Sequence, residues 1–202
     1  MAKSSTKVGY ATGRATKADI VDAAFHVFAE SGYGGTSVRE IARRAGINHA
    51  TLLHHFPHKW LLLQSVLEHR DEIQYIDPTS LDETFALLLG IAIRNEETPG
   101  LTRLFTLLAA ESADPDHPAR AYFRNRLVRL RQQIAHHIEL AQVSGQVSPD
   151  VSPVVAATDI VALWEGLQLQ APISDVPVSV PEHLAAMFAS IAGHTIEPMF
   201  LP

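Results

Sequence analysis

The sequence lacks cysteine altogether, which excludes disulfide bonds, thiolate metal sites and cysteine nucleophiles. It also lacks any apolar run of the roughly 20 residues that a membrane helix needs. Residues 1–17, MAKSSTKVGYATGRATK, are polar and basic without an apolar core, so they do not have the pattern of a signal peptide. We therefore expect a cytoplasmic protein that does not associate with a membrane.

The chain also lacks the short motifs on which most enzyme predictions rest. It contains no G-x-S-x-G, no Walker loop and no G-x-G-x-x-G, and the glycine-rich residues 32–35 follow no strand pattern. Among the eleven histidines, His54 and His58 are four residues apart, but Pro57 interrupts the helix between them. No carboxylate repeats at metal-ligand spacing. We therefore expect no enzymatic activity, no cofactor and no metal ion.

Charge is distributed unevenly along the 202 residues, whose formal net charge is −6. Residues 1–64 contain eight Lys and Arg against four Asp and Glu, whereas the remainder contains eight against eighteen. A basic first third on an acidic body is typical of a DNA-binding head whose body is repelled by phosphate. The hydrophobic content of 47% is that of a globular protein with a packed core.

Helical periodicity and capping signals run through the whole chain, and no strand pattern interrupts them. They predict an all-α fold of about nine helices, at about residues 16–30, 37–45, 49–56, 58–74, 80–95, 99–112, 119–144, 153–170 and 181–193. The last two helices are so rich in Ala, Val and Leu that at least one of their faces is expected to need a partner.

Residues 37–59, SVREIARRAGINHATLLHHFPHK, predict two short helices with a sharp joint. Ser37 and Glu40 form a capping box that begins the first helix, and Gly46 ends it because glycine reaches the positive φ of a tight turn. Asn48 can cap the second helix, which Pro57 ends. Two helices joined in this way are a helix-turn-helix, whose second helix enters the major groove of DNA. The helix before them is expected to pack across the pair, with Phe56 completing a small three-helix core.

Residues 16–63 resemble the tetracycline-repressor (TetR) family of bacterial transcription regulators. The resemblance is carried by AESGYGGTSV at the end of the first helix and by REIARRAGINHATLLHHFPHKWLLL after it. It implies a three-helix DNA-binding head on a six-helix regulatory and dimerisation body. The expected organisation is a flexible basic arm (1–15), a helix-turn-helix domain (16–57) and a ligand-binding and dimerisation domain (58–202). Leu53 and His54 stand where the family usually has one or two tyrosines.

The expected DNA contacts divide into phosphate and base contacts, because phosphates supply affinity and base edges supply sequence choice. The base-edge candidates are Asn48, His49 and Ala50 at the leading end of the recognition helix. The phosphate candidates are hydroxyl, cationic or imidazole side chains: Thr36, Ser37, Arg44, Thr51, His54 and Lys59. His55, by contrast, is expected to be an interior, hydrogen-bonded residue.

The resemblance further implies a homodimer formed by the last two helices and a small-molecule pocket among the middle helices. The interface candidates are Val155, Asp159, Ala162, Gly166, Met187 and Ile191. The pocket candidates are largely aromatic or apolar: Phe85, Leu89, Phe105, Leu108, Tyr122, Phe123, Arg126 and Trp164. Trp164 stands beside Glu165, so an indole N–H and a carboxylate could together orient a ligand. Aromatic residues at helical spacing are, however, more often core residues than pocket residues.

The sequence thus predicts a ligand-responsive DNA-binding transcriptional regulator, more often a repressor in such families. Two recognition helices about one DNA turn apart, roughly 34–36 Å, would read a palindromic operator of double-stranded DNA, and a small-molecule effector would release it. One alternative is an all-helical small-molecule binder or enzyme whose head mediates protein contacts. Another is an architectural DNA-binding protein without an effector, which a body without an internal cavity would favour.

Overall fold

A computed structural model of the protein describes residues 17–73 and 77–200. The expected arm (1–15) and Thr16, the expected cap of the first helix, lie outside the described residues. Over the described ranges the fold is all-α, with the nine helices α1 Lys17–Gly35, α2 Val38–Arg44, α3 His49–His55, α4 Lys59–Ile73, α5 Leu81–Glu97, α6 Pro99–Glu111, α7 Arg120–Val143, α8 Pro153–Gln170 and α9 Val180–Ala192. None of the described helices is long and apolar enough to cross a membrane.

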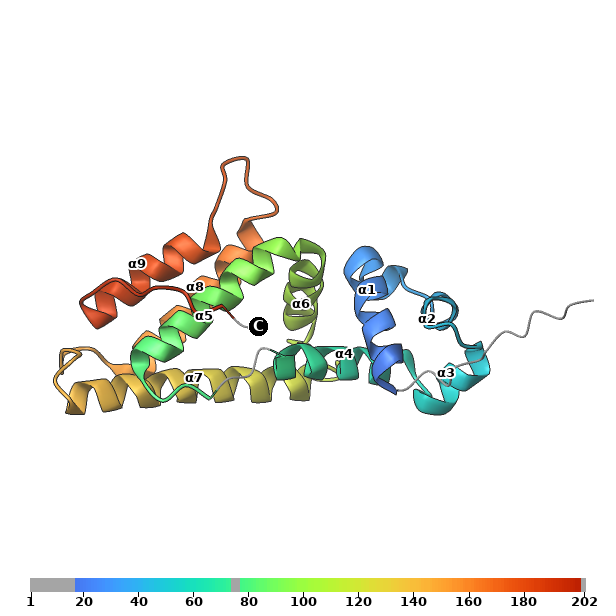
Figure 1. Ribbon diagram of the computed structural model, residues 1–202, viewed down its shortest axis with the longest axis horizontal. Helices are drawn as coiled ribbons and strands as arrows, with labels where there is room; N and C mark the ends of the chain where they lie inside the picture. The colour runs from blue at the N-terminus through green and yellow to red at the C-terminus, as the bar shows by residue number, and fades with distance from the viewer. Residues whose placement is uncertain (1–16, 74–76, 201–202) are drawn as a thin grey trace, which may run out of the picture.

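The molecule has a small head at one end and a larger body at the other (Figure 1). Helices α1, α2 and α3 form the head, α5 to α9 form the body, and α4 lies between them. In the head, α1 buries Ile20, Ala24 and Phe28 against Ile41 and Leu52 of the two short helices. Phe56 belongs to the same core, so the predicted three-helix packing is confirmed.

Helix α1 is longer than the sequence indicated. It was expected to end near Glu30, and the backbone does leave the helical region at Gly32, where φ is 67°. A further helical turn follows the kink and reaches Gly35. Glycine is required at the kink because its positive φ would strain any residue with a Cβ. The link between α1 and α2 is therefore only residues 36–37, and the sharp bend lies before it, at Gly32.

The core of the head is continuous with part of the body. Leu62, Leu63, Val66 and Leu67 of α4 belong to it, and α6 and the start of α7 complete it with Leu101, Leu104, Phe105, Leu108, Ala119 and Phe123. A second core joins α5, α7, α8 and α9, where the rings of Phe85 and Phe188 stack with centroids 4.2 Å apart. Helix α6 contacts both α1 and α8, so it connects the head with the body.

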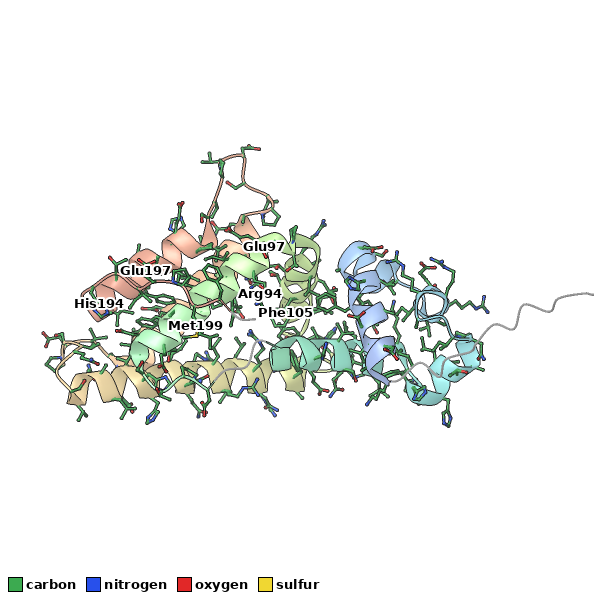
Figure 2. The ribbon with its side chains drawn as sticks, in the orientation of Figure 1. Arg94, Glu97, Phe105, His194, Glu197 and Met199 are labelled. Atoms are coloured by element: carbon green, nitrogen blue, oxygen red, sulfur yellow. The ribbon has the colours of Figure 1, made fainter. Side chains whose placement is uncertain are left out.

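The segment after α9 returns along α5 (Figures 1 and 2). Ile196 of this tail, residues 193–200, is buried in the second core, and the Met199 N–H donates to the Ala86 carbonyl at 2.8 Å. A Cβ added to Gly90 would overlap the carbonyl oxygen of Met199. Glycine at this position of α5 is therefore what allows the two backbones to approach.

A buried histidine couples α5 to α7. The Nδ1 atom of His137 lies 2.6 Å from the Thr84 hydroxyl, and both side chains are buried. Burial lowers the pKa of His137, and neighbouring His136 lowers it further, while Asp77 and Glu83 act in the opposite direction. The folded protein therefore favours neutral His137.

We expect this histidine to make the protein less stable in mild acid. Because its folded pKa lies below its unfolded value, the unfolded chain binds the proton more tightly, so stability falls as the pH drops below about 6.5. Urea unfolding at about pH 7.5 and about pH 5.5 measures the effect. In His137→Gln the acid-induced loss should be smaller, whereas substitution of exposed His183 by Gln should leave it unchanged. An equal loss in all three proteins would contradict the assignment.

Candidate nucleic-acid interface and ligand pocket

The leading end of α3 is exposed and rigidly capped. The Asn48 Oδ1 atom accepts hydrogen bonds from the Thr51 N–H at 2.8 Å and from the Thr51 hydroxyl at 3.1 Å. The amide NH₂ of Asn48 has no partner among the described residues, and His49 and Ala50 beside it are exposed. Three consecutive side chains able to contact base edges therefore lie on one exposed helical turn.

The start of α2 offers a smaller set of phosphate ligands than the sequence suggested. Ser37 is exposed, and its Oγ accepts from the Glu40 N–H at 3.1 Å. Thr36 is only 5% exposed, and its hydroxyl donates inward to the Gly32 carbonyl at 2.7 Å. The expected hydroxyl contact from Thr36 is thus corrected, because its side chain stabilises the bend at Gly32 within α1 instead.

Arg44 joins α1 to α2 by ion pairs. Its NH1 atom lies 2.6 Å from Glu30, and its Nε lies 3.2 Å from Glu40. These contacts lower the pKa of Glu30, and hydrogen bonds from Arg43 and then Arg44 lower that of Glu40 to about 2. Glu30, together with Glu40, which Arg43 shares, thus already balances the charge of Arg44, and a phosphate would have to compete with them.

Lys59 also makes an internal contact. Its Nζ donates to the Tyr33 carbonyl and lies 4.3 Å from the centroid of the Tyr33 ring. Burial lowers the pKa of this ammonium group. Lys59 therefore ties the start of α4 to the last turn of α1, just after the bend at Gly32.

Arg39 is a cation that the sequence reasoning missed. It lies exposed in the first turn of α2, two residues after Ser37, and has no partner within the part of the chain that the structure describes. Its nearness to the Ser37 cap is visible in the sequence, and this spacing could have identified it. Arg39 is therefore better placed for a phosphate than Arg44.

Two histidines end α3, and both face solvent. His54 was expected at the surface, but His55 was expected inside, and the structure corrects that expectation. Leu52 and Phe56, four residues apart, occupy the buried face at this end of the helix. The ring centroids of His54 and His55 lie 5.8 Å apart, which puts two imidazole rings side by side at the end of α3.

The body contains a pocket of about 300 Å³ between α5, α6, α7 and α8. Three of the expected residues line it, namely Phe105, Arg126 and Trp164. Phe105 lies near the middle of the molecule (Figure 2), and the guanidinium of Arg126 lies over its ring at 4.8 Å. Asn95, Thr106 and Gln168 line the pocket as well and were not predicted, because single polar residues on apolar helices give no distinctive pattern.

The other five pocket candidates do not line this pocket. Phe85 and Leu89 belong to the core of the body, and Phe123 belongs to the core of the head. Leu108 lines a separate hollow between α1 and α6, and the Tyr122 hydroxyl donates to the Leu67 carbonyl at 3.3 Å. These five residues lie away from this pocket for one reason: aromatic and leucine side chains at helical spacing form packed cores as readily as pocket walls.

The candidates for a dimer interface lie on α8 and α9, which pack against each other. Val155, Asp159 and Ala162 are exposed along α8. Gly166, Met187 and Ile191 are half-buried, and Gly166 also lines the pocket. The outer surface of α8 also exposes Val154 and Leu169.

Comparison with known proteins gives consistent matches over both parts of the chain. Residues 20–66 match the model described as bacterial regulatory proteins, tetR family, and residues 92–187 match the tetracyclin repressor-like, C-terminal domain. The transcriptional regulator UidR of Escherichia coli (strain K12) is 24% identical over 182 residues, which are 87% of this chain and 92% of UidR. The A-factor receptor protein of Streptomyces griseus is 26% identical over 185 residues, 89% of this chain and 63% of that protein.

A solved structure shares the fold. The crystal structure of a TetR-family transcriptional regulator from Rhodococcus sp. superposes with a TM-score of 0.71 at 21% sequence identity. The match covers 87% of this chain and 97% of that one. The likeness therefore extends over head and body together.

Proposed function

The chain belongs to the TetR family and is a DNA-binding transcriptional regulator, and we propose that it is a repressor that binds a palindromic operator as a homodimer and leaves it when a small-molecule effector binds. Its relatives over most of the chain are transcriptional regulators rather than enzymes. The observation that carries the proposal is the exposed first turn of α3. There Asn48, His49 and Ala50 stand clear of the packed head on a capped helix.

The boundary between the DNA-binding part and the effector-binding part lies near residue 57, although one hydrophobic core extends across it. We assign DNA binding to residues 16–57, and dimerisation and effector binding to residues 58–202. The continuity of the head core with α4 and α6 supports a mechanical connection between the two parts. A movement of α6 would reach α1 directly because these helices are in contact.

In the proposed complex, Asn48 and His49 read base edges, and Ala50 meets a thymine methyl group. Ser37, Arg39, Thr51 and His54 contact phosphates from exposed or half-exposed positions. Arg44 and Lys59 contribute positive potential close to the DNA, while their present hydrogen bonds shape the head. We assign direct phosphate contacts to exposed side chains, and only a contribution to the electrostatic potential to the two cations that already make internal hydrogen bonds.

Dimerisation would pair α8 and α9 of one protomer with those of its partner. The exposed apolar side chains of α8 support this, because a helix that is apolar on its outer side needs a second surface to cover it. A two-fold dimer would place two recognition helices roughly 34–36 Å apart, which is one turn of DNA. The pocket supports effector control, and its presence disfavours an architectural DNA-binding protein.

Binding to the promoter DNA beside its own gene tests the proposal. At about 50 mM salt the full-length protein should retain this DNA over unrelated DNA of equal length, and the affinity should fall by about 10³ or more at about 200 mM. The fall is expected because a dimer that neutralises several phosphates releases their counterions. Sedimentation of the same sample should give a dimer. No preference for the promoter DNA, or an affinity indifferent to salt, would contradict the proposal.

Asn48→Ser should change which sequence is preferred. Serine keeps an oxygen that can cap α3 but removes the amide donor, so discrimination at one base pair of each half-site should fall by about 1–3 kcal/mol. Selection of bound sites from random DNA measures the change, and Asn125→Ser on the exposed face of α7 is the matched control. If both variants select the wild-type motif, Asn48 does not read a base.

A further inference from the structure

Three polar side chains of α8 line the pocket together. Trp164, Glu165 and Gln168 lie within five consecutive residues, so they occupy one side of the helix. None of the three has a hydrogen-bond partner among the residues that the structure describes. Buried polar groups in proteins are usually paired, because an unpaired one costs about 1–3 kcal/mol, and Trp164 is buried. The absence of hydrogen-bond partners for these three side chains indicates that a bound ligand supplies the partners.

Trp164 and Glu165 have complementary requirements. The Trp164 side chain is 8% exposed, and its indole N–H can only donate. The Glu165 carboxylate is half-buried and, when ionised, can only accept. Burial raises the pKa of Glu165, which means that the site solvates its charge poorly, although Arg126 and Arg131 act against the shift. A ligand atom that donates to Glu165 and accepts from Trp164 would satisfy both groups.

The pocket offers a charged ligand no net electrostatic gain. Arg126 and Glu165 carry opposite charges on its lining, so a carboxylate attracted by Arg126 would be repelled by Glu165, and an ammonium group attracted by Glu165 would be repelled by Arg126. An ammonium group would also leave the Trp164 N–H unpaired, since it accepts no hydrogen bond. Apart from Asn95, Thr106 and Gln168, the rest of the lining is apolar, with Phe105, Leu127, Leu130 and Val161 supplied by three different helices.

We propose that the effector is an uncharged, largely apolar molecule with a hydroxyl group, an alcohol or a phenol, which donates a hydrogen bond to Glu165 and accepts one from Trp164. A hydroxyl is the simplest uncharged group that both donates and accepts at one atom. Gln168, one turn further along α8, provides an amide for a second polar atom of the ligand. The pocket volume of about 300 Å³ lies at the small end of the range for ligand sites, so the effector is compact. The inference rests on the proposed function, because it names the ligand of the pocket assigned there to the effector.

Matched ligand series test the inference by calorimetric titration of the full-length protein. Each series keeps one apolar body and changes the polar end: 2-naphthalenemethanol, its methyl ether, 2-naphthylmethylamine and 2-naphthoate, and likewise octanol, methyl octyl ether, octylamine and octanoate. In at least one series the alcohol should bind about tenfold more tightly than the ether, because the ether cannot donate to Glu165. It should also bind more tightly than the amine and the acid. The inference is overturned if the ether equals the alcohol, if a charged member binds best, or if no alcohol binds.

Substitutions identify the residues involved. Glu165→Leu should lower the affinity for the alcohol about tenfold and leave the affinity for the ether unchanged. Glu165→Gln, which keeps a hydrogen-bond acceptor, should retain most of the affinity for the alcohol. Trp164→Phe should lower the affinity for the alcohol, because phenylalanine keeps an aromatic ring in the pocket but has no N–H to donate. Glu139→Gln on the exposed face of α7 is the control. Equal alcohol affinity in Glu165→Leu and the wild type would overturn the assignment of Glu165.

The DNA-binding measurement keeps this inference separate from the function on which it rests. Salt-dependent retention of promoter DNA with no alcohol binding would overturn the ligand class alone. Alcohol binding without specific DNA retention would overturn the regulator proposal and leave the ligand class standing. Release of the DNA by the alcohol, with weaker release in Glu165→Leu, is the result expected if both hold.

Discussion

Phe28→Ala should lower the free energy of unfolding by about 3–5 kcal/mol and, with it, the specific binding of DNA. Phe28 is fully buried, and its ring lies 5.9 Å from that of Tyr33, over which the Lys59 ammonium is placed. Alanine leaves a cavity at the point where α1 supports α2 and α3. The recognition helix is too short to hold its position without that support. Urea unfolding followed by circular dichroism measures the loss of stability.

Phe200→Ala provides the matched control for this effect. It removes the same ring from a side chain that is 69% exposed, so stability should change by no more than about 0.5 kcal/mol. DNA retention should be unchanged in Phe200→Ala and strongly reduced in Phe28→Ala. Equal stability losses in the two variants would mean that α1 is not held by the packing described.

Gly90→Ala should destabilise the full-length protein by about 2–3 kcal/mol. The added methyl group would displace the Met199 carbonyl and detach the tail, which removes the burial of Ile196 and the hydrogen bond between Met199 and Ala86. In a truncated chain that ends at Thr195, Gly90→Ala should instead stabilise the protein. There the same substitution meets no tail, and alanine in a helix interior is favoured over glycine by about 1 kcal/mol.

The reversal is the diagnostic part of this prediction. Thermal or urea unfolding of four proteins, with and without the tail and with Gly or Ala at position 90, measures it as a double-mutant cycle. Gly34→Ala, whose added Cβ would meet no atom within 4 Å, is the control for a glycine without a close neighbour. A destabilising effect of the same size in both chain lengths would show that the tail does not require Gly90.

Local signals in the sequence predicted most of the helices. Ser37 and Asn48 cap the helices that they were expected to cap, and Gly46, with φ of 67°, ends α2. Such signals act within a few residues, and so they can be read from the sequence without the fold. The end of the regular helix near Glu30, just before the bend at Gly32, was predicted for the same reason, although the extra turn after the bend was not.

The features that escaped prediction depend on contacts between distant residues. Arg44 and Lys59 were expected to face DNA, but Glu30 is 14 residues from Arg44, and Tyr33 is 26 residues from Lys59. No local pattern reveals such pairs. Part of the pocket lining escaped prediction for a related reason, since Phe85 and Phe105 have similar helical surroundings in the sequence. Only the packing of α9 on α5 makes Phe85 a core residue and leaves Phe105 beside the pocket.

Phe105 belongs to the head core and also lines the pocket, and this limits how the protein can be recombined with its relatives. Consider a hybrid protein in which residues 16–57 are joined to the body of a related protein. In it, a different α4 and α6 would pack against the head. The apolar surface of α1 would then meet side chains that it does not fit, and specificity for a new operator would come with a weakened fold. If α4 and α6 are transferred together with the head, the apolar contact surface of α1 is kept. Phe105 of α6 then lines the ligand pocket of the related protein. Modular exchange of operator and effector specificity in this chain therefore requires redesign of one helix, α6.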